Sequence, residues 1–316
     1  VRPVIFMNYG GQMRWRMRSG EVLDADLGTM LTKDLTAHAW RTALSPTGEW
    51  IPAVLRAADQ RLTQVRRAIP DAGGLVIATN QTVARAYAKI LAVITGKRPA
   101  VILSDDAKAG GRIEEFAAGQ DRWMVAVRMV SEGVDVPRLA VGVYATSTST
   151  PLFFAQAVGR FVRSRRRGEV ATVFLPTVPI LLAHAATLER QRDHVLGRPR
   201  SEETDIWAET EALIDTANRD EKASDDLLGE FEALDSQATF DHVLFESQAF
   251  GMHAEPTSQD ELDYLGLPGL LEPEQVSTLL AERQRRQLRR RERKDPKSQP
   301  EVPLHRALAN QRKELN

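Results

Sequence analysis

The spacing of hydrophobic residues changes along the chain. Between residues 73 and 180, short continuous apolar runs alternate with segments whose apolar residues recur every three to four positions. Continuous runs are typical of strands buried on both faces, and the wider spacing is typical of amphipathic helices. The pattern predicts strands at 75–79, 100–103, 123–127, 139–144 and 170–175, with helices at 81–94, 107–118 and 151–162. This alternation predicts an α/β fold, with a parallel sheet covered by helices on both faces.

The pattern differs on either side of this region. Residues 1–72 predict a strand at 3–7 and helices at 31–39 and 51–69, and we interpret them as a connector plus helices. Residues 181–294 predict a mainly α-helical accessory region: a helix at 180–196, helix-like spacing of apolar residues at 202–235, a loop with short turns at 257–271, and a helix at 274–294. The last stretch, 295–316, predicts a linker or tail containing prolines.

Composition excludes several classes of protein. Hydrophobic residues make up 42% and charged residues 27%, which is typical of a globular protein. The chain has no cysteine, so disulfides and cysteine-ligated metals are excluded, and its six histidines show no spacing typical of a metal site. No apolar run approaches the length of a membrane span, so we expect a cytoplasmic protein without a membrane partner. The excess of arginine over lysine is compatible with a bacterial source rich in G and C.

Charge is segregated although the formal net charge is −1. Residues 202–235 contain thirteen acidic residues against two basic ones, whereas residues 282–294 contain eight basic residues against two acidic ones. A basic segment of this kind can neutralise nucleic-acid phosphates, and Arg289, Arg290 and Arg291 are the candidates. The alternative interpretation is a solvated helix face.

Two polar groups of residues carry the candidate chemistry. On a helix, Gln156, Arg160 and Arg163 would form one stripe beside Gly159. A second stripe with the same spacing is apolar: Phe154, Val158 and Phe161. A fixed guanidinium stabilises the charge that spreads over the γ-phosphate during hydrolysis, because its planar fork matches phosphate oxygens. Taken alone, an Arg-x-x-Arg pair is also typical of a solvated basic helix end.

The other group is Ser131, Gly133 and Asp135, at the end of an apolar run. Gly133 permits close approach of the backbone, Asp135 can accept a hydrogen bond from a ribose hydroxyl, and Ser131 can donate one to a phosphate. The same residues are also compatible with an ordinary turn.

Together, Ser-Glu-Gly-Val-Asp-Val-Pro at 131–137 and Gln-Ala-Val-Gly-Arg-Phe-Val-Arg at 156–163 resemble motifs V and VI of superfamily 2 helicases. The closest resemblance is to bacterial DEAD/DEAH-box enzymes of the type III restriction-subunit, XPB and RadD-like kind. It implies that residues 73–180 are the second, C-terminal, of two RecA-like lobes. It also implies that Arg160 and Arg163 are arginine fingers, and that Gln156, Gly159, Gly133 and Asp135 contact nucleotide. Many relatives have arginine where this chain has Ala157.

Two further turns have positions similar to nucleic-acid contacts in that family. Thr79, Asn80 and Gln81 follow a predicted strand where motif IV would lie, and a plain helix N-cap at Asn80 is an equally open alternative. Ser149 lies in a hydroxyl-rich turn before the motif VI helix, where it could cap that helix or lie near the nucleic acid.

The chain lacks a G-x-x-x-x-G-K-[ST] phosphate loop and an Asp-Glu box for Mg²⁺. The resemblance therefore implies that ATP and Mg²⁺ are held by an N-terminal RecA-like lobe that this chain does not contain. We expect part of an ATP-dependent DNA (or RNA) helicase or translocase, inactive in ATP hydrolysis on its own. The alternative is a non-catalytic nucleic-acid- or protein-binding module that retains a RecA-like lobe.

Overall fold

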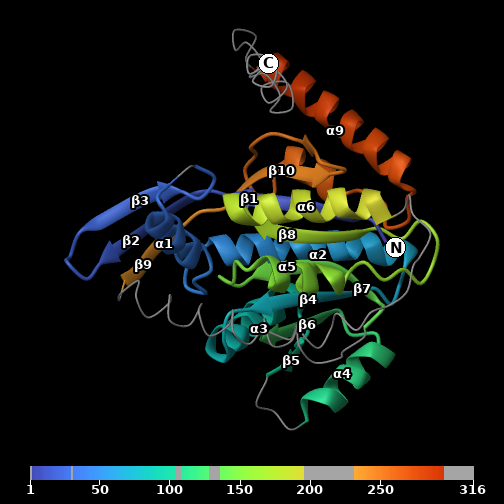
Figure 1. The fold of residues 1–316 in the computed structure, drawn as a ribbon, viewed down its shortest axis with the longest axis horizontal. Coiled ribbons are helices and arrows are strands. Elements are labelled where there is room, and N and C mark those ends of the chain that lie inside the picture. The colour runs from blue at the N-terminus through green and yellow to red at the C-terminus, as the bar shows by residue number, and fades with distance from the viewer. Residues whose placement is uncertain (1, 30, 104–107, 128–135, 196–230, 295–316) are drawn as a thin grey trace.

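A computed structural model describes residues 2–29, 31–103, 108–127, 136–195 and 231–294. An eight-stranded sheet forms its centre (Figure 1). From one edge to the other, the strands are β11 (Gln248–Phe250), β10 (Thr239–Phe245), β1 (Val4–Gly10), β8 (Ala171–Pro176), β7 (Leu139–Ala145), β4 (Gly73–Ala78), β6 (Trp123–Val127) and β5 (Ala100–Ile102).

The six strands from β1 to β5 run parallel, and β10 and β11 extend the sheet in antiparallel fashion beyond β1. Every residue of β4, β6, β7 and β8 is buried, as the continuous apolar runs predict. The predicted parallel α/β sheet is therefore confirmed.

The structure also contains helices, most of which pack against this sheet. They are α1 (Lys33–Ala43), α2 (Trp50–Ala68), α3 (Gln81–Thr95), α4 (Ala109–Ala118), α5 (Pro151–Gly159), α6 (Pro179–Val195), α8 (Gln259–Leu265) and α9 (Pro273–Lys294). Within the described residues, no helix combines the length and the apolar character needed to cross a bilayer.

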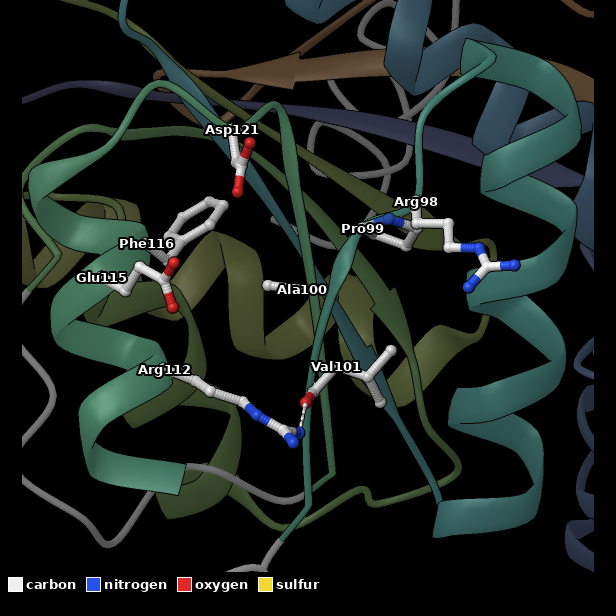
Figure 2. A pocket seen from close by; sticks show the side chains of 8 residues that line it. All are labelled: Arg98, Pro99, Ala100, Val101, Arg112, Glu115, Phe116 and Asp121. Carbon is white, nitrogen blue, oxygen red and sulfur yellow. Dashed lines mark hydrogen bonds between the residues drawn. The ribbon is translucent and has the colours of Figure 1, made fainter. Parts of the chain in front are cut away.

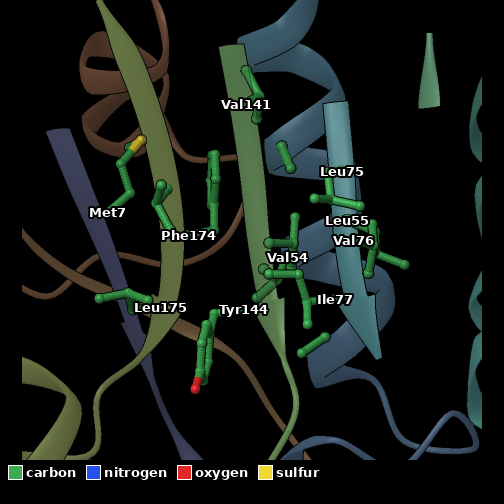
Figure 3. Close-up of a cluster of buried hydrophobic side chains, with 14 of the residues drawn as sticks. Met7, Val54, Leu55, Leu75, Val76, Ile77, Val141, Tyr144, Phe174 and Leu175 are labelled. Atoms are coloured by element: carbon green, nitrogen blue, oxygen red, sulfur yellow. The ribbon is translucent and has the colours of Figure 1, made fainter. Parts of the chain in front are cut away.

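The sheet is covered on both faces. On one face, Arg61 of α2 donates from Nε to Thr172 Oγ1 of β8 at 2.9 Å, and Figure 3 shows other α2 side chains packed against the strands. On the opposite face, Phe154 of α5 stacks on Phe6 of β1, with ring centroids 6.4 Å apart. Phe6 pairs with Val173 of β8, and paired residues of neighbouring strands point to the same face of the sheet. Thr172, one residue earlier, points to the opposite face, so α5 and α2 cover different faces.

Strand β1 is an integral part of the main sheet. It was predicted as a strand, but in a connector region, and the structure inserts it between β8 and β10. Arg2, just before β1, is fully buried, forms an ion pair with the equally buried Glu169, and donates to the Leu139 carbonyl at the start of β7. One side chain thus ties three neighbouring strands together.

The region after α6 contains strands that the sequence did not predict. The helical prediction for 202–235 is wrong at its end, because residues 231–236 form β9 (Phe231–Ser236), and residues 202–230 lie outside the described ranges. Strand β9 pairs with β2 (Gln12–Met17), and β2 pairs with β3 (Val22–Asp26), giving a second, antiparallel sheet. This pairing places the half-buried Phe231 edge-on against His38, which stacks on Trp15 of β2.

The remaining C-terminal helices agree with the prediction except for α8. Residues 257–271 were predicted as a loop with short turns, yet α8 forms within them. Ser258 accepts a hydrogen bond from the backbone of Glu261, and two acidic residues lie in the first turn. Helix α9 confirms the predicted helix at 274–294. The helical character of the C-terminal region is therefore confirmed, with β9, β10 and β11 added to it.

The buried ion pair between Arg2 and Glu169 predicts an effect on stability. We expect Glu169→Gln to lower the free energy of unfolding by about 3 kcal/mol, because it leaves the Arg2 guanidinium buried without a compensating charge. The measurement is urea unfolding. The matched control is Glu232→Gln, which breaks an exposed pair with Arg16 and should cost less than about 1 kcal/mol. Equal losses in the two variants would contradict the prediction.

Candidate nucleotide and nucleic-acid site

Residues 146–150 connect the end of β7 to helix α5. Pro151 occupies its first turn, and the preceding residue, Thr150, is the N-cap, although its side chain makes no capping hydrogen bond. The prediction that Ser149 caps this helix is therefore wrong. Ser149 is half-buried, and its carbonyl accepts a hydrogen bond from His184 Nε2 of α6 at 2.8 Å.

Helix α5 is shorter than predicted. Its last residue is Gly159, and the amides of Arg160 and Phe161 bond three residues back, to Ala157 (3.4 Å) and Val158 (2.9 Å). This tightening closes the helix. A single helical stripe through positions 156, 160 and 163 is therefore wrong, because Arg163 lies beyond the helix.

Phe161 fixes the segment that follows α5. It is 1% exposed, and its ring lies against Gly142 of β7, so close that a Cβ built on that glycine would be 2.4 Å from Phe161 Cζ. One residue later, the Val162 carbonyl accepts a hydrogen bond from the Arg2 amide at 2.7 Å. Arg160 is half-buried and Arg163 exposed, so the two predicted fingers flank a buried anchor. The predicted apolar partners, Phe154, Val158 and Phe161, are all buried.

Gln156 carries a buried acceptor that no described group satisfies. The residue is half-buried, but its side-chain Oε1 is shielded from solvent and accepts no hydrogen bond. Such a group costs about 1 to 3 kcal/mol, so it is expected to have a partner in the working protein. An amine or hydroxyl donor is the chemistry that this atom would accept.

The turn at Thr79, Asn80 and Gln81 follows β4. Asn80 is the N-cap of α3, and its Oδ1 accepts a hydrogen bond from the Val83 amide at 2.9 Å. The N-cap alternative therefore holds for Asn80, whose Oδ1 is engaged, while Thr79 and Gln81 are half-buried.

The predicted site residues lie in separate parts of the structure. Strands β4 and β7 are parallel neighbours, so the turns containing Thr79 and Ser149 leave the same edge of the sheet. Gly159 and the arginines lie at the other end of α5, whose nine residues span about 14 Å. Ser131, Gly133 and Asp135 lie outside the described residues.

The predicted basic residues on α9 differ in environment. Arg290 forms ion pairs with Asp260 and Asp263, at 3.0 and 2.9 Å. Arg291 donates to the carbonyl of His253, whereas Arg289 is exposed. Two of the three predicted phosphate contacts are therefore engaged in holding the helix.

An Asp–His pair lies beside the carboxyl end of β1 and was missed from the sequence. Asp241 Oδ1 is 2.5 Å from His253 Nδ1, with the Asp241 side chain 4% exposed and that of His253 72% exposed. The pKa of His253 is raised above its usual value, mainly by its hydrogen bond with Asp241, whereas burial lowers that of the adjacent His242. No sequence signal identifies the pair, because the residues are twelve apart and Asp241 lies at a register shift between β1 and β10.

The second carboxylate oxygen of Asp241 is buried and has no hydrogen-bond partner in the part of the chain that the structure describes. It lies against the backbone of β1: a Cβ on Gly10 would be 2.5 Å from Oδ2. Across the described ranges, no three His, Cys, Asp or Glu side chains group so that they could hold a metal ion. The pair is therefore an electrostatic contact between β10 and the loop that follows β11.

A pocket of about 400 Å³ lies apart from all of these residues (Figure 2). It adjoins the edge strand β5, and Arg112 donates to the Val101 carbonyl at 3.2 Å beside it. Its lining combines two arginines with Glu115 and Asp121, so it presents no single sign of charge. None of the predicted site residues lines it.

Sequence comparison finds related proteins without a named function. No family model matches the chain. The uncharacterized protein Rv2917 of Mycobacterium tuberculosis is 55% identical over 291 residues, covering 92% of this chain and 48% of that protein. The uncharacterized protein ML1624 of Mycobacterium leprae is 50% identical over 323 residues, covering 100% and 54%. The chain thus spans about half the length of the curated relatives it matches.

Comparison of structures finds parts of helicases at low similarity. Dbp5 of S. cerevisiae, solved bound to RNA and ADP BeF3, matches with a TM-score of 0.34 and 15% identity, covering 52% of this chain and 42% of that one. The Hef helicase domain of Pyrococcus furiosus matches with a TM-score of 0.30 and 18% identity, covering 42% and 28%.

The Phe161 anchor predicts that Gly142→Ala destabilises the protein by about 1 to 3 kcal/mol, because the new methyl group overlaps the ring. The measurement is the free energy of unfolding. Gly159→Ala is the control, since nothing lies within 4 Å of its would-be Cβ, and it should be neutral or slightly stabilising. Phe161→Leu should recover part of the loss in the Gly142→Ala background. A neutral Gly142→Ala variant would show that Phe161 does not hold the segment.

The Asp241–His253 pair predicts a pH-dependent contribution to stability. Because the pKa of His253 is raised in the folded state, its contribution is full below the unfolded value of about 6.5 and is lost as pH rises through the folded value. We expect the difference in unfolding free energy between the wild type and His253→Gln to shrink as pH rises from about 6 to 9. It should stay below about 1 kcal/mol, because the His253 side chain is largely exposed. A difference that grew with pH would contradict this sign.

Proposed function

We propose that this chain is the C-terminal part of an ATP-dependent helicase or translocase that acts on DNA or RNA. In this proposal the chain supplies Arg160 and Arg163 to an ATP site whose phosphate loop and Mg²⁺ ligands belong to an N-terminal RecA-like lobe. The observation that carries the proposal is the Gln-x-x-Gly-Arg-x-x-Arg segment, which begins on α5, is pinned by Phe161 against β7 and places an arginine on either side of that anchor.

Rigid positioning of this segment supports an arginine-finger role. A guanidinium contributes to phosphoryl transfer when it meets the developing charge in a fixed geometry. The contact of Phe161 with Gly142, together with the hydrogen bond between Val162 and Arg2, holds the backbone between Arg160 and Arg163. A merely solvated basic helix end would not need a buried aromatic residue between its arginines.

The unsatisfied acceptor of Gln156 also supports a ligand near this segment. Its Oε1 is buried and has no hydrogen-bond partner among the described residues. In the proposed protein, a hydroxyl or amine of the nucleotide, or a backbone amide of the other lobe, would donate to it. Closing the lobes would then satisfy a group that otherwise destabilises the isolated chain by about 1 to 3 kcal/mol.

The test is ATP turnover by the full-length protein with saturating nucleic acid. Arg163→Ala should lower kcat by about 10³ to 10⁵ while ATP affinity changes by less than about threefold, because the residue acts on charge that develops in the transition state. Arg160→Ala should behave similarly, and the double variant should be little worse, since the pair acts as a unit. Arg163→Lys should restore little, because a point charge does not reproduce the planar fork.

Arg166→Ala is the matched control, because Arg166 is exposed and lies three residues beyond the predicted pair. It should leave turnover unchanged. Turnover by Arg163→Ala within about threefold of the wild type, far less than an arginine finger contributes, would refute the motif VI assignment. Absence of any nucleic-acid-stimulated turnover in the full-length protein would favour the non-catalytic binding module.

A further inference from the structure

Helix α9 is attached to the body along one side. Val276, Leu280 and Gln287 are its buried residues. Gln287 donates from Nε2 to the Met252 carbonyl at 3.0 Å and accepts from the Tyr264 hydroxyl at 3.3 Å. These contacts fix which face of the helix points inward, although the helix extends away from the sheet (Figure 1).

Two arginines extend this inward attachment toward the C-terminal end of α9. Arg290 lies between Asp260 and Asp263 of α8, and Arg291 donates to the His253 carbonyl. The His253 ring in turn contacts Asp241 beside the end of β1. The charges of Arg290 and Arg291 are thus used within the protein.

The outward face of the same stretch carries a second set of arginines. At about 100° per residue, the members of this set fall within an arc of about 100° on the side of α9 opposite Leu280. All four are exposed: Arg285, Arg286, Arg289 and Arg293. We call this set the outer arginine face.

The outer arginine face is not neutralised by the described part of the protein. Arg286, Arg289 and Arg293 form no ion pair with a described residue, and Arg285 donates only to the Ala281 carbonyl of its own helix. At about 100° per residue, Glu282 falls within this arc and Glu292 at its margin, so the four arginines outnumber the glutamates on this side of the helix by two to one. The outer arginine face therefore carries a net positive charge.

We infer that the outer arginine face binds the phosphate backbone of nucleic acid, at a second site separate from the edge of the sheet. From Arg285 to Arg293 the helix rises about 12 Å, which matches three to four nucleotides of one duplex strand at about 3.4 Å each. Guanidinium groups suit phosphate oxygens because of their paired donors. This binding requires no ATP and no arginine finger, so it goes beyond the proposed motor activity.

The experiment measures binding of the full chain to a fluorescent 20-base-pair DNA duplex, without nucleotide, over a range of salt concentrations. The triple variant Arg286→Gln/Arg289→Gln/Arg293→Gln should weaken binding at least tenfold at about 0.1 M salt. It should also reduce the slope of log K against log salt by about 2 to 3, since each phosphate contact contributes about 0.9. The single Arg289→Gln variant should reduce the slope by about one third as much as the triple variant does.

Two controls separate this face from general charge and from the attachment of α9. The triple variant Arg67→Gln/Lys97→Gln/Arg98→Gln removes the same charge from exposed positions elsewhere and should change the slope by less than about 1. Arg290→Gln removes an attachment contact but leaves the outer face intact, so it should also keep the slope. An equal effect of either control would overturn the inference.

The inference would also be overturned by an unchanged slope in the outer-face triple variant, or by binding to anionic phospholipid vesicles but not to the duplex. Circular dichroism should show the same helix content in all variants, since every outer-face side chain is exposed. Failure of the Arg163 turnover test would leave this result standing, because the binding assay contains no ATP.

Discussion

The buried ion pair between Arg2 and Glu169 holds together the strands on which the candidate site rests. Both side chains are at most 1% exposed, so neither charge is tolerated without the other. The surrounding contacts continue this polar clamp. Glu169 also accepts a hydrogen bond from the Arg165 amide at 2.9 Å, and Arg165 pairs with Asp71 before β4. Arg138, stacked on Phe116, donates to the carbonyls of Asp71 and Asp121 at 2.9 Å each. The beginnings of β1, β4, β6, β7 and β8 are therefore linked by guanidinium groups.

This clamp has a direct consequence for the segment from Gln156 to Arg163. The backbone amide of Arg2 donates to Val162, and Phe6 of β1 stacks on Phe154 of α5. The N-terminal strand therefore supports α5 at one end and the arginine segment at the other. A chain lacking β1 would lose both supports, so the first residues are part of the lobe and do not simply lead into it.

Arginine serves different purposes in this protein, depending on its surroundings. Arg61 is completely buried and donates to Thr172 and to carbonyls at Leu265, Leu267 and Pro268, and burial lowers its pKa to about 10. It joins α2 to the C-terminal end of α8, where carbonyl groups lack helical partners. Arg290 has a similar joining role on α9, whereas Arg289, one residue earlier, points to solvent. Charge density along the sequence therefore overstates the number of arginines that are available to a phosphate backbone.

The sequence by itself determined the elements whose signals are local. Continuous apolar runs predicted β4, β6, β7 and β8 because each is buried along its whole length, and the N-cap at Asn80 and Pro151 marked the starts of α3 and α5. The sequence also predicted that the apolar residues Phe154, Val158 and Phe161 would pack inward. Tertiary structure alone decided the rest. Residues 231–236 became a strand because β2 offered a partner, and α5 ended at Gly159 as Phe161 turned onto Gly142. It also brought Asp241 to His253 through a register shift and assigned Arg290 to two aspartates instead of solvent. Each of these outcomes depends on partners distant in sequence, and hydrophobic periodicity carries no information about which partners will meet.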